Sequence, residues 1–371
     1  MAKRKQKISA KQTSSTPPRF VLPAISVVMP MYNVERFVGT CLDSLLAQTF
    51  QNFEVIIVDD CSTDNSVAIV QSYAEKFSGR LKLKKMLKNT GSGTEPRYCG
   101  LKYSCGKYVY FMDNDDALTP TALEELYTLA EKFDADVVYC RGYYNVPENF
   151  SLNDTELIKQ LKPYSYSLGE NYLVQEPTLW ENNLEERVNF LAQQKIMWNY
   201  WLQLVRRDLL IKHSFKPVGI IADDVIFTIC VLCCAKRYVV APNVTYFYRQ
   251  RADSLYHKKF SVDKHLNLWL TMLRDGFQYL DKFLDNYEFF SQRHDLRYAL
   301  LNTFAQNMLR YFLEVYAKNP THEVDKFLRE NFFDSPLESF IFNTANVFHL
   351  NLISASQRIN QLEQELQRLK G

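Results

Sequence analysis

Short apolar runs alternate with amphipathic stretches through the first third of the chain. Runs of β-branched and aromatic residues at 25–29, 55–58 and 108–112 have the length and composition of buried strands, and residues 81–87 are predicted to form a further strand. Apolar residues recur at helical spacing after the first two runs, and a short helix containing Arg97 is expected before the last. This alternation predicts βαβ units, and therefore an α/β fold with a mostly parallel sheet flanked by helices.

Candidate ligand-binding residues follow the predicted strands, and most of them have polar or acidic side chains. They are Pro30, Tyr32, Asn33, Asp59, Asp60, Asn89, Asp113, Asn114, Asp115 and Asp116. Because the carboxyl ends of parallel strands meet at one edge, where open α/β sheets bind ligands, we expect these residues to lie together. Asn33 is also a candidate N-cap for a helix over 34–46.

Three carboxylates within residues 113–116 repel one another unless water or a cation compensates their charge. Hard divalent cations such as Mg²⁺ and Mn²⁺ prefer such ligands. The alternative is a solvated acidic turn ahead of a helix that begins near Thr119-Pro120. A second acidic pair, Asp59-Asp60, at another strand end of the same sheet favours the metal site.

Composition excludes some classes of protein. The chain has 371 residues, of which 47% are hydrophobic and 23% charged, which is typical of a globular protein of two or three domains. A net charge of +2 argues against a general nucleic-acid-binding protein. Residues 1–23 are polar and Lys-rich, and we expect a disordered tail, either inert or in contact with an anionic membrane surface.

The eight cysteines fall in segments with regular patterns, and no secretory signal precedes them. They are therefore expected to be reduced thiols in a cytoplasmic protein. Cys230, Cys233 and Cys234 lie in the apolar run 225–235, where buried packing is favoured over a metal site. This run is also shorter than the roughly 20 residues that cross a bilayer.

The chain resembles the donor-binding domain of the family 2 glycosyltransferases in three segments, VVMPMYNVERFVGTCLDSLLAQTF, VIIVDDCSTDNS and NTG…PRYCGLKYSCGKYVYFMDNDD. The resemblance covers residues 24–140 and continues more weakly to about residue 254. It implies the GT-A (Rossmann-like) fold. It also implies that Asp59-Asp60 contact the uracil and ribose of a nucleotide-sugar, and that Asp113-Asn114-Asp115 hold Mn²⁺ or Mg²⁺ and the diphosphate. Cys61 departs from the family, which usually has glycine there, so the conformation of that turn is in question.

Residues 219–227, GIIADDVIF, resemble the family's Glu-Asp segment ahead of an apolar helix, with Asp223 in place of Glu. We expect Asp224 to be the general base and Asp223 to contact the acceptor, because a carboxylate beside apolar residues can have a raised pKa. The alternative is an acidic pair that caps this helix. One base without a second nucleophile predicts inversion at the anomeric carbon.

Several cationic and aromatic residues complete the hypothesis. Arg97 is a candidate for a bidentate phosphate contact, or an exposed helix arginine. Residues 246–254 match the family's Tyr-x-Tyr-Arg…Ser pattern, which implies that Arg249 and Arg251 lie near the diphosphate. His257 is a candidate metal ligand or a solvated side chain. Trp198 or Trp201 would stack on the acceptor sugar or belong to the core.

The chain is expected to consist of a donor half at 24–140, an acceptor half at 141–260 and a helical accessory domain at 261–371. An insertion at 145–195 would shape the acceptor cleft. Apolar residues at a/d spacing over 352–369 predict either a seam between copies of the chain or a helix packed on its own domain.

The sequence thus predicts an inverting, metal-assisted glycosyltransferase. It would transfer a sugar, expected from a UDP-sugar, to a glycan or lipid-linked acceptor in surface polysaccharide synthesis, in the cytoplasm or at the inner face of the membrane. Two alternatives stay open. A nucleotidyltransferase would carry a Gly-rich phosphate loop near the first strand, where residues 29–33 read MPMYN. A non-catalytic nucleotide-sugar-binding scaffold protein would lack the base.

Overall fold

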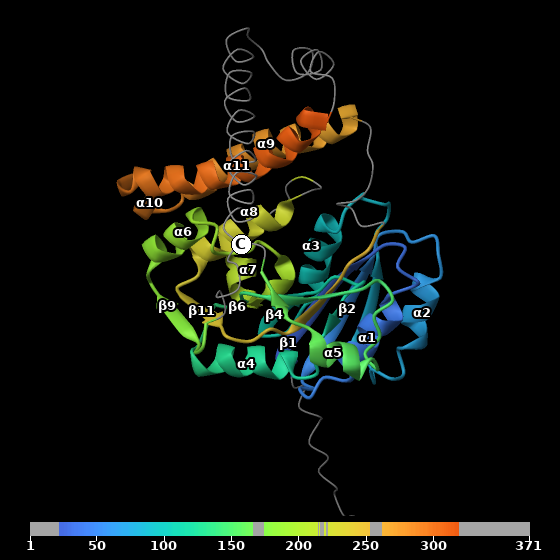
Figure 1. Cartoon of the computed structure of the whole chain (residues 1–371). Helices are drawn as coiled ribbons and strands as arrows, with labels where there is room; N and C mark the ends of the chain where they lie inside the picture. Colours follow the sequence, from blue (N-terminus) through green and yellow to red (C-terminus); the bar gives the residue numbers. More distant parts are fainter. Residues whose placement is uncertain are drawn as a thin grey trace, which may run out of the picture.

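A mixed sheet of eight strands, flanked by helices, forms the centre of the molecule (Figure 1). The computed structural model describes residues 22–165, 174–213, 215, 219, 222–252 and 262–318. The strand order is β3-β2-β1-β4-β10-β6-β11-β9. All residues of β1 and β2 are buried, which explains why their sequences are continuous apolar runs rather than alternating ones.

The first four strands confirm the predicted parallel arrangement. They are β1 (Ile25–Met31), β2 (Phe53–Asp59), β3 (Leu81–Lys85) and β4 (Tyr108–Phe111). The pairs β1–β2, β1–β4 and β2–β3 are all parallel, so the carboxyl ends of the four strands share one edge. The connecting helices are α1 (Val38–Leu46), α2 (Ser66–Ser72) and α3 (Thr94–Tyr103).

The predicted role of Asn33 as a helix N-cap is wrong. Helix α1 begins at Val38, and Phe37 occupies the N-cap position. Asn33 has a left-handed backbone, with φ of 49°, and its side-chain oxygen accepts a hydrogen bond from the backbone N–H of Thr63 at 2.8 Å. Because this side chain is bound to the turn after β2, it cannot cap α1. Helix α2 ends at Ser72, and turns follow it.

The later strands extend the same sheet. β10 (Gln203–Arg206) lies antiparallel between β4 and β6 (Val137–Cys140). β11 (Arg237–Ala241) pairs parallel with β6, and β9 (Thr178–Glu181) forms the edge. One sheet therefore runs through both predicted halves. The division of the chain into domains stays a prediction.

A second, smaller sheet has the order β5-β12-β7-β8. Its strands are β5 (Ala117–Leu118), β12 (Tyr246–Arg249), β7 (Tyr143–Val146) and β8 (Pro163–Tyr164). The helices of this part are α4 (Ala122–Lys132), α5 (Thr155–Gln160), α6 (Leu184–Ala192), α7 (Arg207–His213) and α8 (Asp223–Cys234), with a 3₁₀ turn, η2, at Tyr200–Leu202. The antiparallel pairing of β5 with β12 brings the acidic segment 113–116 next to Tyr246 and Arg249.

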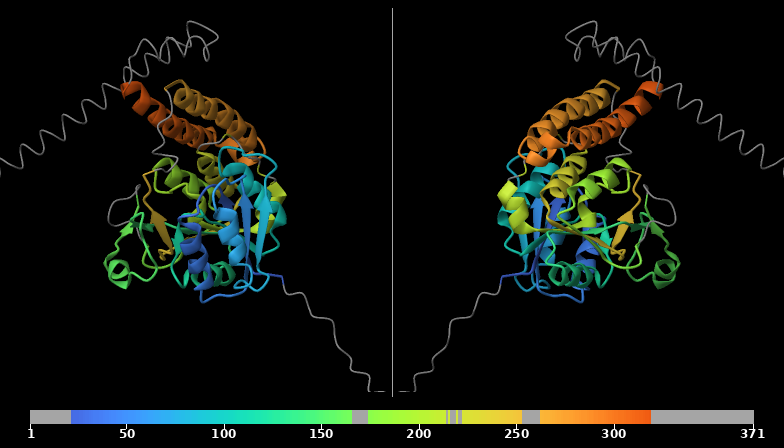
Figure 2. Two further views of the ribbon diagram at one scale, coloured as in Figure 1. Left: turned by 90° about the vertical axis from the view of Figure 1, so that its right-hand side faces the viewer. Right: turned by 90° about the vertical axis from the view of Figure 1, so that its left-hand side faces the viewer.

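The predicted C-terminal helical region is confirmed. It consists of α9 (Val262–Leu284), α10 (Glu288–Gln292) and α11 (His294–Lys318). Helices α9 and α11 pack against each other and lie across α6 and α8, as two further views show (Figure 2). The heptad-like segment 352–369 lies outside the described residues. Within the described part of the chain, no helix is long and apolar enough to span a bilayer.

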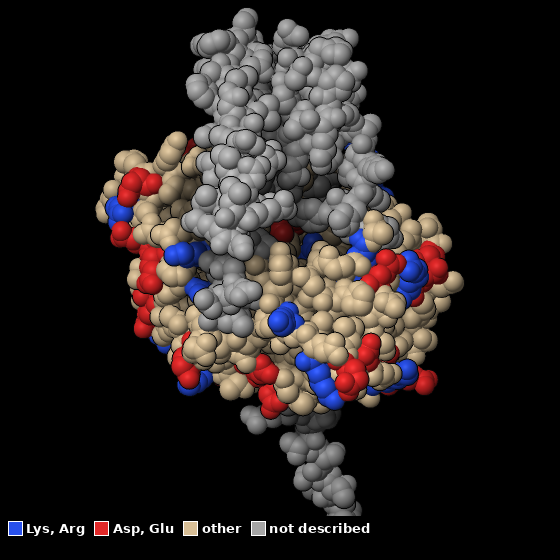
Figure 3. Space-filling model, in the orientation of Figure 1, with Lys and Arg blue, Asp and Glu red and all other residues tan. Residues whose placement is uncertain are grey.

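The cysteines are all free thiols, as predicted. Cys230 and Cys233 are buried in α8, which agrees with the packing role expected for them. On the face drawn in Figure 3, basic and acidic side chains are interspersed over the described surface.

Candidate active site

Both acidic segments lie at the carboxyl end of β1, one on each side. The backbone N–H of Asp60 donates to the carbonyl of Met31 at 2.7 Å, and the side-chain amide of Asn114 donates to the carbonyl of Pro30. Pro30 itself is buried within β1. Two consecutive carbonyls of one strand thus hold the segments that follow β2 and β4. This places the Asp59-Asp60 pair and residues 113–116 at the same edge of the sheet.

The turn at Asp59-Asp60 leaves one carboxylate oxygen without a partner. Oδ1 of Asp59 accepts from the backbone N–H of Ser62 at 3.0 Å. Its Oδ2 is buried and makes no hydrogen bond to any described residue. A buried polar atom without a partner is costly, so Asp59 is a natural acceptor for a ligand's hydroxyl or N–H groups.

Asp60 is instead fully engaged by the loop after β3. Its carboxylate accepts from the backbone N–H and the hydroxyl of Thr90, each at 3.0 Å. Asn89 donates its side-chain amide to the Asp60 carbonyl at 2.8 Å. Burial raises the pKa of Asp60, and the bonds from Thr90 oppose this effect. Asp60 and Asn89 therefore fix the shape of this edge, and Thr90, which carried no sequence signal, is part of that arrangement.

Cys61, at the position where the family usually has glycine, has a backbone conformation typical of glycine. Its φ is 65°, in the left-handed region that glycine adopts without strain. Its thiol donates to the carbonyl of Met86 at 3.3 Å, which ties the turn to the end of β3. Tyr32 lies beside this turn with 45% of its surface exposed, so its ring is available for stacking.

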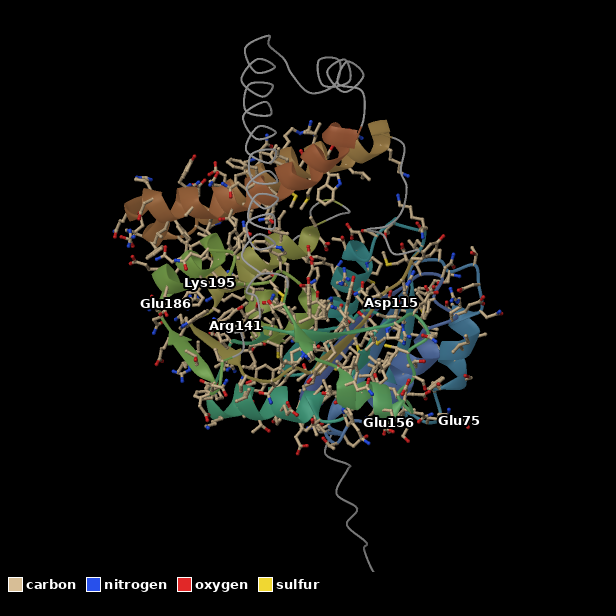
Figure 4. The ribbon with its side chains drawn as sticks, in the orientation of Figure 1. Glu75, Asp115, Arg141, Glu156, Glu186 and Lys195 are labelled. Carbon is tan, nitrogen blue, oxygen red and sulfur yellow. The ribbon has the colours of Figure 1, made fainter. Side chains whose placement is uncertain are left out.

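The acidic segment after β4 divides into two outward-facing carboxylates and one locked carboxylate. Asp113 Oδ1 lies 2.5 Å from Arg97 Nη2, and Asp115 Oδ2 lies 2.6 Å from Arg251 Nη1. Asp113 and Asp115 keep 29% and 24% of their side-chain surface exposed. Figure 4 labels Asp115 on the half of the molecule that holds β2 and α3, away from Arg141, Glu186 and Lys195.

Asp116 is buried and has a structural role. It accepts hydrogen bonds from the hydroxyl of Tyr246 and from the backbone N–H of Arg249, each at 2.7 Å. Burial raises the pKa of Asp116 well above its usual value, and the charges of Asp115 and Asp113 add to the effect. Burial and Asp113 also raise the pKa of Asp115, which Arg251 opposes.

Arg249, expected near the diphosphate, points into the protein instead. Its side chain is 4% exposed and donates to the carbonyls of Asp115 and Glu148 at 2.7 Å. These bonds hold the acidic segment against the second sheet. Of the two arginines Arg249 and Arg251, it is Arg251 whose side chain contacts a carboxylate of the predicted metal site.

Asp223 and the proposed general base, Asp224, are the first two residues of helix α8. Asp223 Oδ2 accepts from the hydroxyl of Tyr200 at 2.9 Å, and Asp224 Oδ1 accepts from the backbone N–H of Val225 at 2.9 Å. Burial and the charge of Asp223 raise the pKa of Asp224 to about 7, although Arg97 lowers it. Ala222, with φ of 53°, occupies the N-cap position, so both aspartates lie in the first turn and neither is the N-cap. A carboxylate with this pKa is suited to accept a proton near neutral pH.

Arg97 joins the two parts of the site. Its guanidinium contacts Asp113, lies 4.0 Å from Asp223 Oδ2, and stacks over Tyr200 at 4.6 Å from the ring centroid. Burial alone would lower the pKa of Arg97, but Asp113 and Asp223 raise it. Arg97 therefore stays charged and links the carboxylates after β4 to those of α8.

Of the two roles left open for Trp201, the structure supports the core, and its neighbour Tyr200 is the aromatic residue that reaches the site. Trp201 is 4% exposed and stacks on Tyr246, with ring centroids 4.2 Å apart, so it belongs to the core. Tyr200, its neighbour, reaches Arg97 and Asp223. One tyrosine among 23 carries no local pattern that distinguishes it, so sequence reasoning missed it.

The chemistry of Asp113 and Asp115 fits a divalent cation. Mg²⁺ is commonly held by one or two carboxylates, with water and substrate phosphates as its other ligands. Among the described residues, no three His, Cys, Asp or Glu side chains are placed to hold a metal together. Two carboxylates are sufficient when a diphosphate supplies further oxygens. His257, the predicted third ligand, lies outside the described residues.

The chain is similar in sequence to known glycosyltransferases. The family model described as glycosyl transferase family 2 matches residues 26–201. The chain is 28% identical over 250 residues to the uncharacterized glycosyltransferase EpsJ of Bacillus subtilis, which covers 66% of this chain and 67% of the relative. It is 27% identical over 227 residues to the poly(ribitol-phosphate) beta-N-acetylglucosaminyltransferase TarP of Staphylococcus aureus, which covers 60% of this chain and 62% of TarP.

Solved structures support the fold. The crystal structure of S. aureus TarS 1–349 in complex with UDP-GlcNAc superposes with a TM-score of 0.53 at 22% identity, over 82% of this chain and 83% of that chain. The crystal structure of TarS 1–349 without that ligand gives a TM-score of 0.55 at 21% identity. The GT-A-like arrangement of sheet and helices is thus shared.

Proposed function

The chain belongs, through residues 26–201, to glycosyltransferase family 2, and we propose that it transfers a sugar from a UDP-sugar to a hydroxyl group of a glycan or lipid-linked acceptor. The observation that carries this proposal is Arg97, which contacts Asp113 and lies near Asp223. It brings the residues suited to the donor and those suited to the acceptor into one site. Transfer between two substrates requires such a meeting.

The donor would bind along the carboxyl ends of β1, β2 and β4. The unpartnered Oδ2 of Asp59 is suited to accept hydrogen bonds from the uracil or ribose, and exposed Tyr32 is suited to stack on the base. A structure of TarS in complex with UDP-GlcNAc supports a UDP-sugar as donor. Asn33, Asp60 and Asn89 would act indirectly, because each is bound to the turns that shape this edge.

Asp113 and Asp115 would hold a Mn²⁺ or Mg²⁺ ion, with the buried Asn114 fixing the segment between them. Such an ion neutralises the charge that develops on a leaving diphosphate. Arg97 and Arg251 neutralise the same two carboxylates in the structure. We propose that both guanidinium groups contact phosphate oxygens when the donor is bound.

Asp224 would act as the general base. It would accept the proton of the acceptor hydroxyl while that oxygen attacks the anomeric carbon and the bond to the nucleoside diphosphate breaks. One such displacement inverts the anomeric configuration. The pKa of about 7 supports this role, and Asp223, held by Tyr200, is suited to contact the acceptor.

The acceptor is proposed at the level of chemical class only. TarP is named as a poly(ribitol-phosphate) beta-N-acetylglucosaminyltransferase, so its named acceptor is a polymer. We propose a glycan or lipid-linked acceptor for surface polysaccharide synthesis, in the cytoplasm or at the inner face of the membrane. Assembly of copies through the C-terminal helices stays a prediction.

The proposal is tested by measuring UDP release from UDP-sugars, with acceptor and with or without Mn²⁺. Asp224→Asn is expected to slow release about a hundredfold or more while donor binding is kept. Asp208→Asn is the matched control, because Asp208 is an exposed aspartate in the first turn of the neighbouring helix α7. Asp224→Asn turnover at the wild-type rate would contradict the assignment of the base.

The two alternatives predict no UDP release in this experiment. A scaffold protein would bind the donor without any turnover in the wild type. A nucleotidyltransferase would release pyrophosphate when it is supplied instead with a nucleoside triphosphate and a sugar phosphate. Either result would replace the proposed function.

A further inference from the structure

The loop after β3 carries a leucine that is wholly exposed. Leu87 has 104% of its reference surface accessible, more than any other large apolar side chain of the described residues. Its neighbour Met86 packs against the core, and the Met86 backbone N–H donates to the carbonyl of Asp59 at 2.8 Å. Because Met86 is anchored inward, Leu87 points into solvent, next to the proposed nucleotide site.

Lysines precede and follow this leucine along the edge of the sheet. β3 is an edge strand, and Lys84, Lys85 and Lys88 lie in or just after it. Lys84 Nζ lies 4.4 Å from the ring centroid of Tyr103, which is 47% exposed and follows Lys102 at the end of α3. We refer to Lys84, Lys85, Leu87, Lys88, Lys102 and Tyr103 as the basic edge.

The charges of the basic edge are not neutralised within the molecule. In the described part of the chain, no ion pair engages any of its four lysines. In contrast, Lys82, earlier in the same strand, pairs with buried Glu54 at 2.6 Å. Four unpaired lysines around an exposed apolar side chain and a tyrosine are typical of a surface that binds a membrane interface. The lysines meet anionic headgroups, and the apolar side chain enters the acyl boundary.

We propose that the basic edge docks on an anionic lipid bilayer. Charge complementarity favours anionic lipid, and full exposure of Leu87 favours a bilayer over a polymer of phosphates, which offers no apolar phase. Docking here would hold Asp59 and the nucleotide site close to the membrane surface, because only the loop after β3 would separate them from it. The idea that this placement brings the site to a lipid-linked acceptor rests on the proposed function, but membrane binding itself does not.

The test is sedimentation of the full chain with lipid vesicles. We expect binding to vesicles of phosphatidylcholine mixed with phosphatidylglycerol, and much weaker binding to phosphatidylcholine alone. The triple change Lys84→Glu, Lys85→Glu, Lys88→Glu should lower the partition coefficient about a hundredfold or more. Leu87→Ser should lower it about tenfold.

Matched controls separate this surface from others. The triple change Lys132→Glu, Lys159→Glu, Lys236→Glu alters the net charge equally at exposed sites elsewhere, and Tyr298→Ser removes another exposed apolar side chain. Both should bind vesicles as wild type does. Every variant keeps the Lys-rich residues 1–23, so wild-type binding by both basic-edge variants would overturn the proposal.

Charge and apolar contact can be told apart in the same assay. If the lysine variant loses binding but Leu87→Ser does not, the surface binds anionic headgroups through charge alone, and the proposed entry of Leu87 into the acyl boundary is refuted. UDP release in solution without vesicles should be unchanged in the basic-edge variants, because none of these residues belongs to the proposed catalytic machinery. Vesicle binding by a wild-type protein that transfers no sugar would leave this inference intact and refute the proposed function.

Discussion

Asp224 and the two charged residues around it determine the pH dependence that we expect. A general base acts when deprotonated, so activity should rise with pH through about 7, the pKa of Asp224, and fall away below it. Asp223 raises this pKa and Arg97 lowers it. Asp223→Asn should therefore move the rising limb of kcat against pH to lower pH, and Arg97→Ala should move it to higher pH.

These opposite shifts separate electrostatic effects from general damage to the site. The measurement is a pH–rate profile for each variant, with Arg97→Lys as a further comparison. Lysine keeps the positive charge but lacks the planar guanidinium group that can contact two carboxylates at once. The pH of the rising limb should therefore stay close to that of the wild type, while kcat/KM falls. If Asp223→Asn and Arg97→Ala move the rising limb in the same direction, then the charges of Asp223 and Arg97 do not set the pKa of Asp224 in the way described.

The same residue gives a prediction for stability. The pKa of Asp224 is about 7 in the folded state, against a usual value of 3.8. Between these pH values the folded protein binds a proton that the unfolded chain does not, so Asp224 reduces stability as the pH rises. Asp224→Asn should raise Tm at pH 8 and change it little at pH 4. Differential scanning calorimetry tests this, and a lower Tm at pH 8 would contradict it.

Some residues of the site could be predicted from the sequence because their types are rare in such positions. Carboxylates that directly follow buried apolar runs, such as Asp59 and Asp113, are seldom placed there by packing, since burying a charge is costly. Thr90 and Tyr200 could not be found in this way, because their role depends on partners 30 and 23 positions away. Arg249 shows the opposite case, since its residue type indicated a ligand contact but its side chain is directed to backbone carbonyls.

Among the elements, helix α9 can approach helix α8, which carries the proposed general base Asp224, because residue 276 of α9 is glycine. An added Cβ would lie 2.6 Å from Phe304 Cζ and 3.0 Å from Ile226 Cδ1, two residues beyond Asp224. Alanine in a helix is intrinsically favoured over glycine by about 1 kcal/mol, but overpacking a buried contact costs about 1–3 kcal/mol. Gly276→Ala should therefore lower Tm and, by displacing α8, lower kcat.

Thermal unfolding and steady-state kinetics of Gly276→Ala check this prediction. Gln278→Ala, at an exposed position of the same helix, controls for helix propensity and should leave kcat unchanged. A rise in Tm for Gly276→Ala would mean that the neighbouring side chains move aside without loss.

Elements were predicted well where the pattern is local and poorly where pairing is distant. The ends of β1 to β4 lie within two residues of the predicted runs. For β1, β2 and β4 the reason is that a strand buried on both faces is a continuous apolar segment. β10 pairs with Tyr110 through Leu204, across a long stretch of chain, and its four residues carry no periodicity that would identify it. The start of α1 was missed because a tertiary hydrogen bond holds Asn33.

At the scale of the whole molecule, the C-terminal helices cover the helix that carries the base. Nine of the twelve residues of α8 are buried, and α9 and α11 supply part of that cover (Figure 2). A chain ending at residue 252 should therefore expose apolar surface and lose cooperative unfolding. A chain that begins at residue 22 is the control and should unfold like the full protein in calorimetry. Cooperative unfolding of the shortened chain at the normal Tm would show that α8 needs no cover.

The proposed function requires that carboxylates from distant parts of the chain bind a cation and a nucleotide-sugar at one edge of the sheet. Titration calorimetry of UDP, with and without Mn²⁺, measures this binding. We predict Mn²⁺-dependent UDP binding by the wild type and by Asp224→Asn, and loss of that dependence in Asp113→Asn and Asp115→Asn. UDP binding that is equal with and without Mn²⁺, or unchanged in both variants after β4, would contradict the account.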